Sequence, residues 1–171
     1  MRSGDRAGER GRGLDATDDA REGERLSLRV ADEDDLAVLA SMLQDAVIAI
    51  GDMRYIASEK LFVMLASRFR WEAIIDGDTE NGAEGPEFER IHCGVSFEAV
   101  EGVKVRGMDL KDRSQYLDLL TVLADENAVT LTFAGGAAIR LDVLRISCHM
   151  RDMGEPWPTT NRPDHKLADG G

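Results

Sequence analysis

The clearest pattern along the chain is a strict alternation of apolar and polar residues, which predicts β-strands with one buried face. This alternation occurs in residues 26–30, 91–99, 129–133 and 139–143. Gly135 and Gly136 stand between the last two segments, and a glycine pair in that position predicts a tight hairpin turn.

Two irregularities interrupt the alternation. The apolar phase of residues 91–99 resumes at Val103 and Val105. One strand of that length is unusual, so we expect a bend or a break at residues 100–102. Near the end of the last segment the apolar phase moves from odd to even positions, which predicts a β-bulge at residues 143–145 inside one continuous strand.

One segment has the period of an α-helix. Apolar residues recur there at spacings of three and four positions, namely at Leu36, Leu39, Ala40, Leu43 and Val47. Asp32 precedes the segment as an N-cap residue, and acidic residues follow it where the helix dipole favours negative charge. We therefore expect a helix over residues 33–46 with one face on the core.

The middle of the chain predicts further strands. Residues 47–50 are apolar and largely β-branched and end at a glycine, and residues 53–56 and 61–69 follow with a short interruption between them. This order predicts a strand and then a hairpin. Residues 116–123 suit a helix or a strand, and their β-rich surroundings together with the turn that follows favour a strand.

These elements predict an α+β fold, mainly an antiparallel curved sheet or partly closed barrel of about seven to eight strands with one helix on the N-terminal side. The single domain is expected to cover residues 26–153. Residues 1–25 carry too few large apolar side chains to form a core, so we expect a disordered extension, one that could lie upstream of the natural start codon. Residues 154–171 are expected to form an irregular, partly docked tail, because three prolines surround Trp157.

Charge narrows the classes of partner. The chain has 33 acidic and 21 basic residues and a formal net charge of -12, and its basic residues are scattered along the sequence. Such a surface repels phosphate backbones and anionic lipids, so we expect no nucleic-acid or membrane binding. The chain has no signal-peptide pattern and no long uncharged apolar stretch, which indicates a cytoplasmic protein.

Two pairs of residues have the side chains that zinc prefers, His92 with Cys93 and Cys148 with His149. Neighbours on a strand point to opposite faces, and the apolar phase places both cysteines inward and both histidines outward. The two pairs therefore cannot converge on one ion. Two cysteines are also too few for a disulfide-rich scaffold, so we expect free, buried thiols.

An acidic segment has the spacing of part of a calcium-binding loop. Asp76, Asp78, Glu80 and Glu87 take positions one, three, five and twelve of that pattern. Asn81 stands where the pattern requires glycine, and no amphipathic helix flanks the segment. We therefore expect a solvated loop and predict neither a metal nor an organic cofactor.

Several segments in combination resemble one family. They are residues 28–31, 35–38 and 43–46, then 97–108, and then 133–141 with the tail 154–165. The chain is similar in these segments to a family of uncharacterised alphaproteobacterial proteins known as a domain of unknown function. The resemblance implies no activity. It does imply that the N-terminal extension lies outside the shared domain and that the Trp157 tail lies inside it.

No set of residues specifies a reaction, because no nucleophile has a base placed on the same face and no two carboxylates can be argued into different roles. We expect a non-catalytic protein-interaction or scaffold domain. The alternative is a small-molecule-binding protein or enzyme with a site in a cavity of the sheet. Trp157, Arg162 and His165 are the candidate partner contacts, although Trp157 could instead fold back on the sheet. The sequence does not define an oligomeric state.

Overall fold

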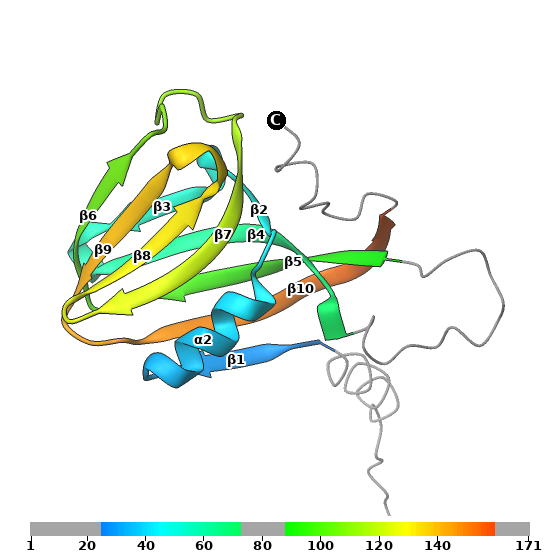
Figure 1. The fold of residues 1–171 in the computed structure, drawn as a ribbon, viewed down its shortest axis with the longest axis horizontal. Coiled ribbons are helices and arrows are strands. Elements are labelled where there is room, and N and C mark those ends of the chain that lie inside the picture. Colours follow the sequence, from blue (N-terminus) through cyan, green and yellow to red (C-terminus); the bar gives the residue numbers. More distant parts are fainter. Residues whose placement is uncertain (1–24, 73–87, 160–171) are drawn as a thin grey trace, which may run out of the picture.

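The computed structural model describes residues 25–72 and 88–159, which form one ten-stranded antiparallel sheet and one α-helix (Figure 1). The strands run in the spatial order β1-β10-β5-β4-β2-β7-β8-β9-β6, and β3 pairs with β4 beside this path. The elements are β1 (Ser27–Val30), α2 (Glu33–Met42), β2 (Val47–Ala49), η1 (Ile50–Asp52), β3 (Met53–Ile56), η2 (Ala57–Glu59), β4 (Leu61–Phe69), β5 (Phe88–Phe97), β6 (Val100–Arg106), β7 (Tyr116–Asp125), β8 (Ala128–Phe133), η3 (Ala134–Gly136), β9 (Ala138–Val143) and β10 (Cys148–Thr159). The predicted α+β class with a curved antiparallel sheet is confirmed, with more strands than expected.

The sheet is curved so that its two halves share one core. Met64 of β4 and Phe97 of β5 are buried in the same cluster as Leu131 of β8 and Ile139 of β9. The helix α2 lies next to β1 and β7 and adds Leu36, Leu39 and Leu43 to this cluster (Figure 1). Among the described residues no helix is long and apolar enough to cross a membrane.

The helix begins as predicted and ends earlier. The Asp32 carboxylate accepts the Asp35 N–H at 2.8 Å, so Asp32 is the N-cap. The helix ends at Met42 because Asp45, with φ of 64°, turns the chain toward β7. There the Asp45 N–H donates to the Leu119 carbonyl at 2.9 Å. Sheet pairing therefore replaces the last turn of the predicted helix over residues 33–46.

Most predicted strands are present. The ambiguous segment 116–123 forms β7, and the strand and hairpin expected over residues 47–69 are β2, β3 and β4. The glycine turn between β8 and β9 is also confirmed. Gly135 and Gly136 have φ of 84° and 89°, a region in which an L side chain is strained.

The two irregularities of the alternation both mark passages between the halves of the sheet. The first passage lies at Glu98 and Ala99, slightly before the expected position, and a register shift follows between Val100 and Gly102. The expected bulge at residues 143–145 is wrong, because β9 ends at Val143 and a new strand begins at Cys148. The apolar phase changes there because the chain moves to a different part of the sheet.

The irregular tail predicted from residue 154 is also partly wrong. Residues up to Thr159 belong to β10, where Trp157 is opposite Arg90 after a register shift that begins at Met153. Prolines are tolerated in this part of the strand because β1 pairs with β10 only as far as Arg151, which leaves one edge unpaired beyond it. Residues 1–24, 73–87 and 160–171 lie outside the described residues, and with them the predictions for the N-terminal extension and the acidic loop.

Candidate functional site

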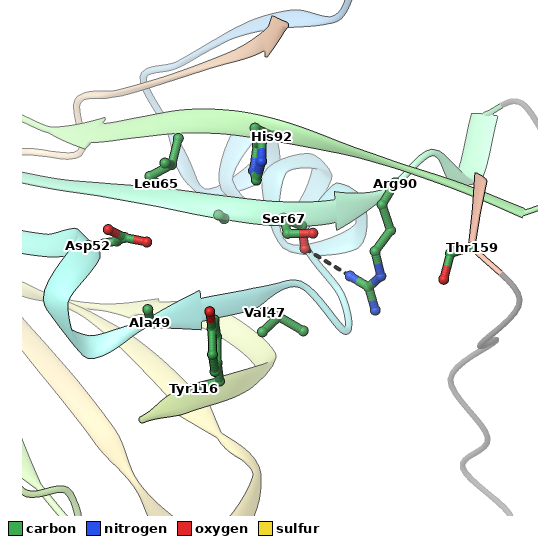
Figure 2. A pocket seen from close by; sticks show the side chains of 10 residues that line it. Val47, Ala49, Asp52, Leu65, Ser67, Arg90, His92, Tyr116 and Thr159 are labelled. Atoms are coloured by element: carbon green, nitrogen blue, oxygen red, sulfur yellow. Dashed lines mark hydrogen bonds between the residues drawn. The ribbon is translucent and has the colours of Figure 1, made fainter. Parts of the chain in front are cut away.

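A cleft of about 390 Å³ opens on the outer face of the sheet, on the side away from the core (Figure 2). It exists because β2 pairs with β4 at a single position, Val47 opposite Ser67. Beyond this position η1 carries the chain away, and pairing with β4 resumes at Met53 of β3, opposite Met64. The interruption leaves this edge of β4 unpaired at Leu65 and Ala66, which both line the cleft.

The cleft has an apolar floor between two groups of opposite charge. Val47, Ala49 and Leu65 supply apolar surface. Figure 2 shows Asp52 at one end of this surface and Arg90 at the other. Tyr116 lies beside the surface, near Ala49 and Val47. A ligand lying along the floor would therefore meet a carboxylate at one end and a guanidinium at the other.

Two contacts fix the position of the Arg90 guanidinium. Its guanidinium carbon lies 4.0 Å from the centre of the Phe69 ring, and its Nη1 donates to the Ser67 carbonyl at 3.0 Å. Phe69 is fully buried, with the Trp71 ring centre 5.3 Å from its own. The hydrogen bond uses one of the five N–H groups of Arg90, and its guanidinium forms no other within the described residues.

The charge of Arg90 is retained in this setting. Burial lowers the pKa of Arg90, and the negative charges of Asp118 and Asp45 act in the opposite direction. Arginine stays protonated across the physiological range even when its pKa is lowered. The cleft therefore presents a permanent, oriented cation.

His92 forms another part of the cleft wall, and Trp157 packs against it. The two ring centres are 4.6 Å apart and the ring planes are inclined by 49°. Trp157 is half-buried, since one side of its ring rests on the sheet. Within the described residues no side-chain hydrogen bond links His92, Tyr116 or Asp52 to another cleft residue. Among the described residues, His92, Tyr116 and Asp52 thus form no hydrogen-bonded acid and base pair with one another.

A second polar arrangement lies on the opposite, buried face. Arg68 is fully buried and Asp152 is 2% exposed, and they form two hydrogen bonds, from Nε at 2.8 Å and from Nη2 at 2.7 Å. The guanidinium also donates to the Phe69 carbonyl and to both carboxylate oxygens of Glu72. Every N–H group of Arg68 thus has an acceptor, so this arrangement is structural and leaves no donor for a ligand.

Comparison with known proteins adds a family to this description. The family model for proteins of unknown function DUF2948 matches residues 26–165. The chain belongs to the DUF2948 family. No curated protein and no solved structure matches the chain. The resemblance to a domain of unknown function is confirmed, with the N-terminal extension outside the matched region and Trp157 inside it.

The structure of the DUF2948 domain separates the predicted site residues. Trp157 lies beside the cleft, whereas Arg162 and His165 fall outside the described residues. The structure agrees with the strand-face argument against a shared zinc site. Cys93 and Cys148 are fully buried, whereas His92 is exposed. His149 lies on the outer face, where its Nε2 is 3.4 Å from a Glu98 oxygen.

The same burial raises the pKa of both thiols of the DUF2948 domain. Burial raises the pKa of Cys93 to about 12, against an ordinary value of 9.0. Burial likewise raises the pKa of Cys148, and the negative charge of Glu98 adds to the increase. A thiol that stays protonated at neutral pH is a poor nucleophile and a poor metal ligand.

The sequence analysis identified neither the residues of the DUF2948 cleft nor the buried Arg68. The two cases differ in how clearly the sequence indicates the residues. Arg90 and Asp52 are ordinary polar residues in their segments, and only the missing pairing between β2 and β4 brings them to one cleft. Arg68 did carry a signal, because it stands in the same phase as the buried residues Met64 and Ala66. A charged residue in a buried phase requires partners.

Proposed function

We propose that this DUF2948 domain binds a small dipolar molecule in the outer cleft. An anionic group of the ligand is held by Arg90, and a cationic or hydrogen-donating group is held by Asp52. The observation that carries the proposal is the Arg90 guanidinium, which is fixed over Phe69 at one end of an apolar floor. Cations held in this way bind carboxylates through charge-assisted hydrogen bonds.

Binding accounts for the cleft better than catalysis does. A general acid or base needs a neighbour that tunes its proton affinity. His92 instead packs on Trp157, and Tyr116 is 70% exposed. An apolar depression with a few convergent polar groups is typical of ligand sites. The interaction role expected from the sequence is not the one we propose, since its anchor Trp157 has one side of its ring on the sheet.

The length of the cleft limits the ligand. Asp52 lies near Leu65 of β4, and Arg90 is opposite Phe69, four residues further along. Four residues of a strand span about 13 Å, and the Arg90 side chain reaches back toward Ser67, which shortens the distance between the charges. We therefore expect a zwitterion with several bonds between its charged groups to fit better than an α-amino acid.

Titration of the isotope-labelled chain with simple zwitterions tests the proposal. The probes are glycine, γ-aminobutyrate and aminocaproate, followed by backbone amide shifts of Ala49, Ser67 and His92. Aminocaproate should shift these signals at the lowest concentration, and Arg90→Gln should weaken its binding by about tenfold or more. Asp52→Asn should weaken aminocaproate more than hexanoate, which has no amino group.

Arg145→Gln is the matched control, because Arg145 is exposed and lies outside the cleft. Arg90→Lys keeps the positive charge and checks that any loss with glutamine does not reflect misfolding. Equal affinity for aminocaproate in wild type and a folded Arg90→Gln variant would refute the proposal, as would shifts confined to other parts of the sheet.

A further inference from the structure

A second opening lies in the wall of the curved sheet between β3 and β6, and we refer to it as the window. It has a volume of about 210 Å³ and is separate from the outer cleft. β3 pairs only with β4 and β6 only with β9 among the described strands, so each has an unpaired edge. The window lies between these two strands.

Hydrogen bonds mark the two ends of the window. At one end the Tyr55 hydroxyl donates to the Val100 carbonyl at 2.9 Å. At the other end the Gly51 N–H donates to the Arg113 carbonyl at 2.8 Å, and the Arg113 Nη2 donates to the Gly51 carbonyl at 3.1 Å. The opening is therefore bounded on all sides, and its size suits a small group better than an added strand.

The inside of the window is apolar and leads to the core. Phe62 and Ile139 form its inner wall and are almost fully buried. At its rim Val105 is 36% exposed and Leu110 is 54% exposed. Large aliphatic side chains left in water beside the core favour an apolar ligand that would cover them.

The charged groups that line the window are two arginines, Arg54 and Arg113. Arg54 is exposed and forms no ion pair within the described residues. The nearest acidic residues of the adjoining loop bond within that loop, Asp109 to the Lys111 N–H and Asp112 to the Ser114 hydroxyl. A chain with a net charge of -12 thus has two cations at an apolar opening.

We propose that the window binds an amphipathic monocarboxylate, with an aliphatic chain inserted among the core side chains and its carboxylate on Arg54 and Arg113. The volume is below the range of about 300 to 1,000 Å³ found for sites of drug-sized ligands, which limits the aliphatic part to a short or medium chain. The apolar wall selects the tail, and the arginines select the head group.

Octanoate is the probe for this site, observed through methyl signals of the isotope-labelled full chain. Octanoate should shift the methyl groups of Val103, Val105 and Leu110, and these shifts should persist in Arg90→Gln. Any shift of the Val47 methyl groups, in the outer cleft, should be lost in that variant. Arg54→Gln should weaken binding by about threefold or more, and added salt should have the same effect because the arginine is exposed. Arg145→Gln should leave the affinity unchanged.

Two further comparisons test the proposal, one with a different probe and one with a filled window. Octanol, which has no carboxylate, should bind wild type more weakly than octanoate does and should bind Arg54→Gln no more weakly than wild type. Val105→Phe should block octanoate by filling the window while keeping both arginines. Full affinity for octanoate in a folded Val105→Phe variant, or shifts at Val47 instead of the window, would overturn the proposal.

Discussion

Arg68 of β4 and Asp152 of β10 form a bidentate ion pair that passes over the strand between them, β5. The pair lies on the core face close to Cys93, whose partner in β10 is Asp152. The Asp152 carboxylate also accepts the Leu26 N–H at 3.0 Å. One buried charge pair therefore connects β4 with β10 and fixes the chain that enters β1.

Removal of one partner of this pair should strongly destabilise the domain. We expect Arg68→Met to lower the free energy of unfolding by about 3 to 5 kcal/mol, because Asp152 would remain buried without its partner. Urea titration followed by circular dichroism measures the change. The double variant Arg68→Met/Asp152→Leu should recover part of the loss, and Arg145→Met should change stability by less than about 0.5 kcal/mol. A loss below about 1 kcal/mol for Arg68→Met would contradict this role.

Glu72 should make the stability of the fold depend on pH in the acidic range. Burial alone would raise the pKa of Glu72, but the hydrogen bonds and the charge of Arg68 lower it below its ordinary value of 4.5. A lowered pKa in the folded state stabilises the fold above the unfolded pKa, and this contribution is lost as pH falls through the folded value. Stability of wild type should therefore fall below about pH 4.5 more steeply than that of Glu72→Gln. Parallel slopes in urea titrations over this range would count against the prediction.

The cysteines should react only after unfolding. Both thiols are fully buried, and the raised pKa of each keeps it protonated at neutral pH. An aromatic disulfide reagent at pH 8 should label neither cysteine in native protein and should label both in urea. The rate in dilute urea should follow the fraction unfolded. Rapid labelling of one cysteine in native protein would show that part of the sheet opens locally.

The N-cap of α2 can be tested with a neighbouring control. Asp32→Ala should lower the free energy of unfolding by about 1 kcal/mol, because its carboxylate accepts the Asp35 N–H. Asp34→Ala is the control, since Asp34 is acidic and in the first turn but does not cap the helix. Similar losses for the two variants would assign the effect to the helix dipole instead.

Trp157 should stabilise the isolated domain. The ring is half-buried against His92, so we expect Trp157→Ala to lower the free energy of unfolding by about 1 to 3 kcal/mol. A double-mutant cycle with His92→Ala should give a coupling of about 0.5 to 1.5 kcal/mol. Unfolding curves that coincide for wild type and Trp157→Ala would disprove the docked position and return Trp157 to the role of a partner contact.

Alternating patterns predicted strands well because one face of this sheet rests on the core. The segment that forms β9 alternates for this reason, and it was identified without ambiguity. The bulge predicted near Val143 is wrong because an alternation that changes phase looks the same for a bulge and for a passage to another strand, here the passage from Val143 to Cys148. Strand order, which distinguishes the two, depends on contacts distant in sequence.

The candidate sites depend even more on distant contacts. Arg90 and Asp52 are brought to one cleft by an interruption in pairing, and Arg54 and Val105 are brought to one window by two unpaired edges. No local pattern encodes an interruption between strands. Arg68 is the exception, because a charged residue in a buried phase could have been identified from its own strand.

The pairing of β1 with β10 sets a condition on the biosynthesis of the domain. Leu28 of β1 is opposite Met150 of β10, and the intervening strands are synthesised between them. During translation β1 therefore leaves the ribosome long before its partner exists, and this pairing forms only after β10 has emerged. A chain that stops before β10 would leave one edge of β5 unpaired, and an unpaired strand edge can pair with another chain.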